Sequence, residues 1–289
     1  MSVDEPPFSS IAIAGLGLIG GSIALAVRER WPSVRITGVD QAAVLAHARG
    51  SGAVDRTAQS IADIGTPGLV VLAAPVAQNV ELLRTLVADS GSRSAGMLVT
   101  DVGGTKRDIV AAARALAAPL VFVGGHPIGG AERGGFGFAR PDLFEGRPWI
   151  LTPEPVTDAA AVTRLERFVL GLGARPATLD AGDHDRLMAY VSHLPQLAAS
   201  ALMASVGERA PDGLRLAGRG LVDTTRLASS PASVWRDIAA SNRDFIGEAL
   251  DSLIATLTEL RRDLQDGEAL EQTFGEAGRW RAELMKGRD

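Results

Sequence analysis

Three glycines near the N-terminus have the spacing of a dinucleotide-binding turn. Gly15, Gly17 and Gly20 follow the apolar run Ile11–Ala14 and open a segment with helical spacing of apolar residues. In a strand–turn–helix unit, the first glycine makes the tight turn, the second lets the backbone approach a pyrophosphate, and the third allows close helix–strand packing. The start of the helix then offers unpaired N–H groups to the phosphates.

Asp40 lies where a ribose ligand is expected. It ends the second apolar run, 20 residues after Gly20, and its carboxylate can accept hydrogen bonds from both hydroxyls of an adenosine ribose. A 2′-phosphate at the same place would face this carboxylate, with Gln41 rather than an arginine beside it. The pattern therefore predicts NAD, rather than NADP, as the cofactor.

Two later strand ends should border the same crevice, because open parallel sheets bind ligands at the carboxyl ends of their strands. One is the end of the run Leu69–Ala73, which continues with Ala74, Pro75 and Val76; the other follows Thr100 and begins with Asp101 and Val102. We expect both near the nicotinamide. The predicted cofactor-binding residues are Gly15, Gly17, Leu18, Ile19, Gly20, Asp40, Ala73, Ala74, Pro75, Val76, Asp101 and Val102.

His126 is the histidine best placed for chemistry. It follows the apolar run Leu120–Val123 and two glycines, so its imidazole should lie at the same sheet edge, where it can act as a general base. His47 lies on a predicted surface helix. His184 and His193 are nine residues apart on one predicted helix and do not share a face, as metal ligands four residues apart would. We expect no metal site.

The pattern of apolar residues changes near residue 180. Before it, short aliphatic runs alternate with helical patterns, which is typical of βαβ units; after it, only helical patterns remain. We predict an α/β fold, with an N-terminal Rossmann-type, doubly wound and mostly parallel sheet at 1–180 and an all-helical substrate and dimerisation domain at 181–289. Strands are expected at Ile11–Ala14, Val34–Val39, Leu69–Ala73, Met97–Thr100, Leu120–Val123, Trp149–Leu151 and Arg175–Leu179. Helices are expected at Ile19–Arg30, Ala42–Gly50, Ala77–Ala88, Lys106–Leu116, Thr157–Leu170, Asp183–Val206 and Ser233–Leu264.

Composition narrows the range of partners. The chain has 289 residues, a net charge of −5, 4% aromatic residues and no cysteine, which argues against nucleic-acid partners, an anionic membrane surface and thiolate chemistry. The acidic N-terminus and the lack of an apolar run of about 20 residues predict a soluble, cytoplasmic protein. The apolar stripe from Trp235 to Leu264 is too long for one small domain to cover, so we expect a homodimer.

Five stretches together resemble the prephenate/arogenate dehydrogenases of tyrosine biosynthesis. In chain order they are GLGLIGGS, TDVGGTK, HPIGGAERGG…LFEGRPWILTP, DHDRLMAYVSHLPQ and GLVDTTRLASSPASVWRDIAASN. The resemblance implies an NAD-dependent oxidative decarboxylation of a small-molecule substrate. Hydride leaves C4 of the cyclohexadienyl ring, a base takes the C4 hydroxyl proton, and the ring carboxylate leaves as carbon dioxide, so that prephenate gives 4-hydroxyphenylpyruvate.

The resemblance also assigns roles to residues. It implies that His126 is the base and that Arg226 holds a substrate carboxylate. Glu132 and Asp223 match the acidic residues of an ion network that orients this arginine. The residues implied at the substrate are Arg226, Glu132, His193, Gln196, Asp223 and Trp235.

Two positions depart from the family pattern. Gly104 stands where the family often has a serine, and Thr105 is our candidate to supply that catalytic hydroxyl. Gln196 replaces the second histidine of SHLPH, and its amide can donate to the keto acid of prephenate or accept from the amino acid of arogenate. We prefer prephenate, with arogenate dehydrogenase or a dual cyclohexadienyl dehydrogenase as alternatives.

Two remoter classes fit part of the pattern. A β-hydroxyacid dehydrogenase would use a helix lysine as its acid/base, whereas this chain has lysines only at Lys106 and Lys286. A non-catalytic, NAD-sensing regulator would keep the glycines and Asp40 but need not bring His126, Glu132 and Arg226 into one pocket.

Overall fold

The computed structural model describes residues 5–88, 97–115, 120–130 and 133–286. The chain forms two compact units, of which the first ends at Arg243 and the second begins at Asp244. The first unit thus contains both the sheet and the first helices that follow it. The predicted domain boundary at residue 180 rests on the point in the sequence where strand-like apolar runs end, and it stays a prediction.

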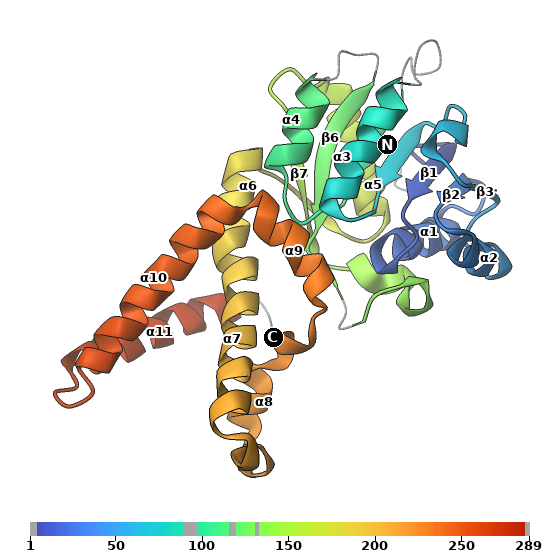
Figure 1. Ribbon diagram of the computed structural model, residues 1–289. Coiled ribbons are helices and arrows are strands. Elements are labelled where there is room, and N and C mark those ends of the chain that lie inside the picture. The colour runs from blue at the N-terminus through green and yellow to red at the C-terminus, as the bar shows by residue number, and fades with distance from the viewer. Residues whose placement is uncertain (1–4, 89–96, 116–119, 131–132, 287–289) are drawn as a thin grey trace. The chain divides into compact units, whose positions relative to one another are not determined.

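The strands of the described residues form one eight-stranded sheet in the first unit (Figure 1). They are β1 (Ser10–Ala14), β2 (Arg35–Val39), β3 (Arg56–Ala58), β4 (Leu69–Leu72), β5 (Leu98–Asp101), β6 (Val121–Pro127), β7 (Pro148–Thr152) and β8 (Arg175–Thr178). Their order is β3-β2-β1-β4-β5-β6-β7-β8, and all neighbours are parallel except β6 and β7. The order 3-2-1-4-5-6 is that of a Rossmann sheet, which confirms the predicted fold class.

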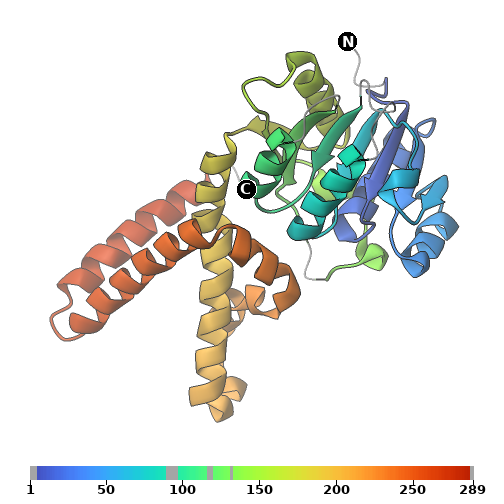
Figure 2. The same ribbon diagram turned by 45° about the horizontal axis from the view of Figure 1, so that its top comes forward.

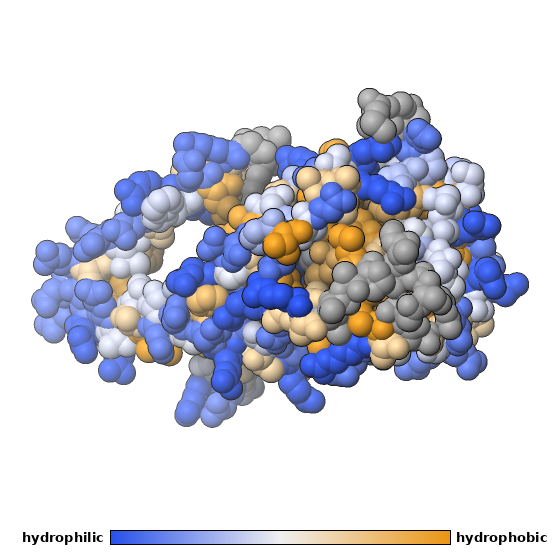
Figure 3. All heavy atoms as spheres, turned by 90° about the horizontal axis from the view of Figure 1, so that it is seen from above, coloured by the Kyte–Doolittle hydropathy of each residue, from blue (hydrophilic) through white to orange (hydrophobic). Residues whose placement is uncertain are grey.

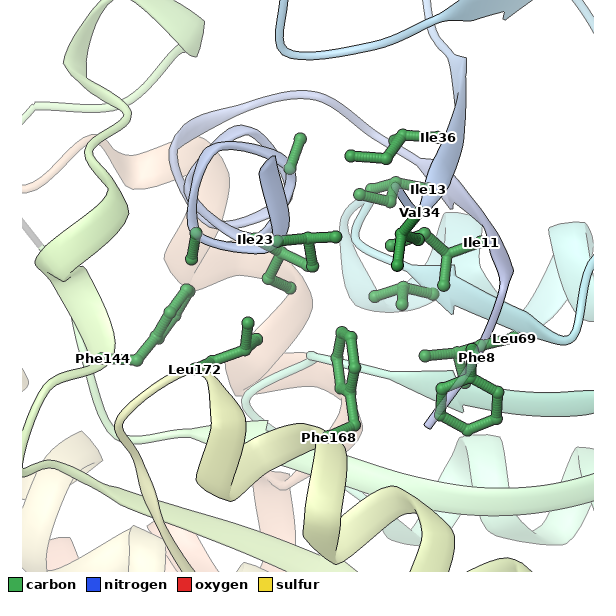
Figure 4. Packing of buried hydrophobic residues seen from close by; sticks show 14 of the residues in the cluster. Phe8, Ile11, Ile13, Ile23, Val34, Ile36, Leu69, Phe144, Phe168 and Leu172 are labelled. Atoms are coloured by element: carbon green, nitrogen blue, oxygen red, sulfur yellow. The ribbon is translucent and has the colours of Figure 1, made fainter. Parts of the chain in front are cut away.

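Helices cover both faces of this sheet. They are α1 (Leu18–Arg30), α2 (Ala42–Gly50), α3 (Val76–Ala88), α4 (Arg107–Ala115) and α5 (Ala159–Gly171). Successive side chains of a strand point to opposite faces, so Ile11 and Ile13 of β1 pack with residues of α1, α2 and α5 (Figure 4). Ala12 and Ala14 instead pack with residues of α3 and α4. Burial on both faces explains why the central strands read as continuous apolar runs.

Two strands differ from the sequence prediction. β3 was not predicted, because its three residues, Arg56–Ala58, are exposed or half-buried at the sheet edge and lack an apolar run. β6 continues past Val123 to Pro127, because its second half changes partner and pairs antiparallel with β7. His126 therefore lies within a strand, opposite Ile150, rather than in the loop after it.

The rest of the first unit is helical. The predicted helix Asp183–Val206 is interrupted: α6 (Ala181–Met188) and α7 (Leu194–Arg209) are joined by a π turn at Ala189–His193, and together they form a continuous rod (Figure 2). Pro195 lies in the first turn of α7, just after the π turn. Two short helices follow, α8 (Arg219–Thr224) and α9 (Ala232–Ser241). Short 3₁₀ turns occur at Ile61–Asp63, Phe136–Phe138, Pro141–Phe144, Pro211–Leu216 and Arg226–Ser229.

The second unit consists of α10 (Arg243–Arg262) and α11 (Glu268–Met285). The single helix predicted for Ser233–Leu264 is therefore two helices that break at Asn242, which is the C-cap of α9. Gly267, at φ +85°, is the N-cap of α11. No helix in the described part of the chain is long and apolar enough to cross a membrane.

Candidate active site

The three glycines after β1 have different surroundings. A Cβ atom on Gly15 (φ +96°) would lie 2.5 Å from the carbonyl oxygen of Ala73, and one on Gly20 would overlap the carbonyl oxygen of Gly15. These two positions admit only glycine because the turn, α1 and the end of β4 are in close contact. A Cβ on Gly17 would meet nothing within 4 Å among the described residues, so this face of the turn is open to a ligand.

The turn ends at an N-terminus of α1 that lacks a side-chain cap. Gly17 is the N-cap, and the first turn of the helix holds no acidic residue. Asp40, at the end of β2, accepts hydrogen bonds from Leu16 N (2.6 Å) and Gln41 N (2.7 Å). The open helix end can bind a phosphate, and the fixed carboxylate can accept ribose hydroxyls. These residues therefore fit a dinucleotide.

The predicted cofactor residues at the later strand ends differ from one another. Ala74 N donates to Asn79 Oδ1 (3.0 Å), and Val102 N donates to Leu72 O (3.1 Å), so both segments are held at the sheet edge. Asp101 is fully buried, and its carboxylate accepts from Gly103 N, Gly125 N and Lys106 Nζ. This side chain is occupied by contacts within the protein.

Asp101 and Lys106 hold the strand segment that carries His126. Asp101 Oδ1 accepts from Gly125 N (3.1 Å), and Lys106 Nζ donates to Gly125 O (2.7 Å) and to Asp101. Paired Cα partners of β5 and β6 end at Thr100 and Val123, so this buried ion pair satisfies the backbone of Gly125 beyond the ladder. The two glycines before His126 are also explained: a Cβ on Gly124 would overlap Thr152 Oγ1, and one on Gly125 would lie 2.7 Å from Asp101 O.

His126 is linked to two residues of α6 that the sequence analysis did not assign to the site. His126 Nδ1 lies 2.8 Å from His184 Nε2, and His184 Nδ1 lies 2.8 Å from Asp185 Oδ1. His126 is half-buried, whereas His184 and Asp185 are both 0% exposed. Burial and then the fields of His184, Lys106 and His193 lower the pKa of His126 well below its ordinary value of 6.5. The imidazole is therefore neutral near neutral pH and able to accept a proton.

Asp185 is held as an anion by several donors. Its carboxylate accepts from Lys106 N (2.7 Å), Arg107 N (3.0 Å) and Arg107 Nε (3.2 Å). Burial opposes ionisation, but the hydrogen bonds from His184 and from the backbone of Arg107 and Lys106 outweigh it and lower the pKa of Asp185. The first turn of α4 and the start of α6 are thereby joined next to His126.

A second branch joins this cluster to His193. Asn242 Nδ2 donates to Asp185 O (2.8 Å) and lies 3.3 Å from His193 Nδ1. The rings of His193 and Trp235 meet edge to face, with centroids 6.0 Å apart. Burial lowers the pKa of His193 to about 4, so this imidazole is also neutral near neutral pH. His126, His193 and Trp235 are thus brought together through α6, α9 and the π turn.

Gly104 and Thr105, the two positions considered for the catalytic hydroxyl, have different neighbours. A Cβ on Gly104 would lie 3.9 Å from His126 Nε2, so a serine here would face the imidazole. The hydroxyl of Thr105 instead pairs with Ser241 Oγ at 2.9 Å. A catalytic role for Thr105 stays a prediction, and the contact observed is one that ties α9 to the sheet.

Gln196 was expected beside the substrate side chain, but its amide is hydrogen-bonded to other residues of the protein. Its Nε2 donates to Leu227 O (2.7 Å) and to Ser200 Oγ (3.3 Å), and its Oε1 accepts from Ser230 Oγ (3.2 Å). The buried amide therefore tethers the 3₁₀ turn Arg226–Ser229 to α7, and this turn carries Arg226.

Arg226 and Asp223 are both exposed and are not ion-paired with each other in the described part of the chain. The predicted network around Arg226 is thus not formed by this pair. Glu132, its other predicted member, lies outside the described residues.

The sequence pattern does not predict four residues of this cluster as site residues: Lys106, His184, Asp185 and Asn242. Each lies inside a stretch that carried the family resemblance, TDVGGTK, DHDRLMAYVSHLPQ or DIAASN. The signal that could have identified them is a polar side chain in the middle of such a stretch. Periodicity could not show that they share one buried network, because they come from three different segments.

Comparisons with known proteins agree along most of the chain. The family model "Prephenate dehydrogenase, nucleotide-binding domain" matches residues 23–178, and "Prephenate dehydrogenase, dimerization domain" matches residues 180–276. A prephenate dehydrogenase of Bacillus subtilis is 36% identical over 282 residues, which are 94% of this chain and 75% of that protein. A cyclohexadienyl dehydrogenase of Zymomonas mobilis is 30% identical, with 98% of each chain covered.

Solved structures show the same relationship. The prephenate dehydrogenase of Aquifex aeolicus, in complex with hydroxyphenyl propionate and NAD+, has a TM-score of 0.87 and 30% identity, and the match covers 96% of this chain and 98% of that one. An arogenate dehydrogenase of Synechocystis has a TM-score of 0.78 and 28% identity, with 94% and 99% covered. Both halves of the sequence, the Rossmann sheet and the histidine cluster at its edge therefore point the same way, and the chain belongs to the prephenate dehydrogenase family.

Proposed function

We propose that this chain oxidises and decarboxylates prephenate to 4-hydroxyphenylpyruvate and carbon dioxide, with NAD as the hydride acceptor. The observation that carries the proposal is the environment of His126. Its Nδ1 is engaged by a buried His184–Asp185 pair. Its Nε2 faces Gly104, where a Cβ atom would lie 3.9 Å from this nitrogen and 3.5 Å from Ile238 Cδ1. A neutral imidazole held in this way is suited to accept a proton from a substrate hydroxyl.

The cofactor would be held by the first turn of the fold. Gly17 and the N-terminus of α1 would bind the pyrophosphate, and Asp40 would bind the adenosine ribose. NAD, when bound, supplies the acceptor for the hydride that leaves C4 of the substrate. The protein itself has to orient the substrate and hold the base, because aromatisation of the ring provides the driving force.

The substrate would lie between His126 and the residues of the helical part. Nε2 of His126 would take the C4 hydroxyl proton, so that the O–H bond breaks and an N–H bond forms. Arg226 would bind a carboxylate with its planar guanidinium, and Trp235 and His193 would border the ring. Lys106 is unsuited to act as acid or base, since its ammonium is buried between Asp101 and Gly125 O.

The substrate side chain distinguishes prephenate from arogenate. Both ends of the Gln196 amide are used within the protein, which leaves this residue without a free group to select a keto acid over an amino acid. Arogenate therefore stays an alternative substrate, as in the Synechocystis relative.

The test is a steady-state assay of NADH formation, followed by absorbance at about 340 nm, with prephenate and arogenate compared at equal concentrations. We expect NADH and carbon dioxide to form in equal amounts with prephenate and kcat/KM to be higher for prephenate than for arogenate. A higher value for arogenate would reverse the preference. No NADH with either substrate, from protein that binds NAD, would contradict the proposal.

We further propose that the enzyme is a homodimer in the cytoplasm. Apolar side chains that are exposed along α10 and α11 support the dimer, as does the family name of this segment, "dimerization domain". On the face of the molecule that Figure 3 shows, hydrophilic residues surround smaller hydrophobic patches. The cytoplasmic location rests on the sequence pattern alone and stays a prediction.

A further inference from the structure

We propose that His184 and Asp185 are positioning residues that hold His126 in the one tautomer whose Nε2 is bare, and so make it a base toward the substrate. This inference rests on the proposed function, because it assumes that His126 is the base. His184 and Asp185 touch neither substrate nor cofactor in this proposal; they act through His126.

The direction of the hydrogen bonds follows from the donors on Asp185. Its carboxylate already accepts from two backbone N–H groups and from Arg107 Nε, so it is an anion that can only accept. His184 Nδ1 must then donate to it. In a neutral imidazole the other nitrogen is an acceptor, so His184 Nε2 accepts from Nδ1–H of His126. The remaining nitrogen of His126, Nε2, therefore carries a lone pair.

Burial keeps this arrangement unique. His184 and Asp185 are 0% exposed, so no water replaces either partner. The opposite tautomer of His126 would place two lone pairs 2.8 Å apart, on His126 Nδ1 and His184 Nε2, unless His184 gained a second proton. A hydrogen bond that is missing inside a buried site costs more than one exposed to water. A free histidine side chain, by contrast, exchanges between both tautomers.

The same chain of contacts prepares the site for the charge that develops. When Nε2 takes the substrate proton, His126 becomes a cation whose Nδ1–H donates to His184, which in turn donates to the anion of Asp185. The charged and titratable groups around His126 are Lys106 and Asp101 from the β5–α4 segment, His184 and Asp185 from α6, and His193 from the π turn. Lys106 opposes a positive charge on His126, and Asp185 is the anion in contact with its partner.

Two substitutions of His184 separate the two hydrogen bonds. The amide of His184→Asn sits near the position of Nδ1, so it can still donate to Asp185 but does not reach His126. The amide of His184→Gln sits near the position of Nε2, so its oxygen can still accept from His126 Nδ1. We expect kcat to fall by about 10²–10³-fold in His184→Asn and by about tenfold or less in His184→Gln. KM and NAD affinity should change by less than about threefold in both.

Either of two kinetic results would overturn the proposal. One is an equal loss of kcat in His184→Asn and His184→Gln; the other is a kcat of His184→Asn within about threefold of that of the parent enzyme. His47→Asn is the matched control for loss of a histidine, because His47 is exposed on α2. Parent enzyme that is inactive with both substrates would count against the proposed function instead, since the comparison between variants needs a working enzyme.

A spectroscopic measurement tests the tautomer without any turnover. Nitrogen-15 NMR of histidine-labelled protein distinguishes a protonated from a bare ring nitrogen. In the parent enzyme at neutral pH we expect His126 to show a protonated Nδ1 and a bare Nε2, and His184→Gln to keep this pattern. His184→Asn should show averaged signals for both nitrogens. A parent enzyme with protonated Nε2 on His126 would refute the proposed polarity even if the enzyme is active.

Discussion

The protonation of His126 should control the acidic side of the pH–rate profile. Only the neutral imidazole can accept a proton, and burial, followed by the fields of His184 and Lys106, lowers its pKa well below 6.5. The base is therefore already active at pH 6.5, and kcat/KM should fall only on further acidification. We expect an acidic limb with an apparent pKa below the ordinary value of about 6.5.

Replacing this residue tests the same prediction. His126→Asn keeps a hydrogen-bonding group but cannot take the proton, so kcat should fall by about 10²–10⁴-fold, with substrate still bound and the acidic limb lost. A variant that keeps near-normal kcat, or the same acidic limb, would place the base elsewhere; His193 would be the next candidate.

Asp40 should set the choice of cofactor. Asp40→Ser combined with Gln41→Arg removes the anion at the end of β2 and adds a partner for a 2′-phosphate, so kcat/KM for NADP should rise while that for NAD falls. Asp40 also anchors Leu16 N, and the melting temperature of the variant shows whether the turn is intact. Parent enzyme that already prefers NADP would contradict the role of Asp40.

Arg226 should contribute binding energy in both the ground state and the transition state. Arg226→Ala should raise the KM for prephenate, with a loss of roughly 2–5 kcal/mol if the substrate carboxylate is left unpaired in a desolvated site. NAD affinity, measured by fluorescence titration, should hardly change. An unaltered KM would remove Arg226 from the site. Gln196→Ala offers a comparison, because it frees the turn that carries Arg226 without removing the guanidinium.

At the scale of elements, the buried pair of Lys106 and Asp101 should matter for stability because it joins β5, β6 and the start of α4. Lys106→Met keeps the volume but leaves the carboxylate of Asp101 buried without its cation, which should lower the free energy of unfolding by about 3–5 kcal/mol. Adding Asp101→Asn should recover part of this loss. Arg84→Met is the control: it breaks the exposed pair with Glu81 and should cost less than about 1 kcal/mol. Similar losses in the two single variants, measured by urea unfolding, would argue against a clamp.

The elements of the sheet could be predicted closely from the sequence, and the partners of its residues could not. Strands such as Leu69–Leu72 are buried on both sides, so an apolar run shows them directly. The second half of β6 could not be read in this way, because its pairing with β7 is a contact between segments. The glycine turn, Asp40 and His126 could be predicted because each is identified by its spacing from a nearby strand in the sequence. The partners of His126 come from α6 and depend on how that helix packs on the sheet, which local periodicity does not record.

At the scale of the whole molecule, we expect the second unit to form the interface between two chains. Ile254 and Leu257 lie three residues apart on α10, and Leu264 lies in the turn just after it; they are 57%, 55% and 72% exposed. An exposed apolar stripe of this kind marks an interaction site, and a second copy of the same chain would cover both stripes at once. We therefore expect light scattering at micromolar concentration to give twice the chain mass of 30.1 kDa.

A charge placed on the stripe should separate the chains. Leu257→Glu puts a carboxylate into the predicted interface, where burial without a partner is unfavourable, so the measured mass should fall toward that of one chain. Ala255→Glu adds the same charge on a different face of α10, at another exposed position, and should leave the dimer unchanged. A parent protein that is monomeric, or a Leu257→Glu variant that stays as dimeric as Ala255→Glu, would mean that the stripe on α10 is not the interface.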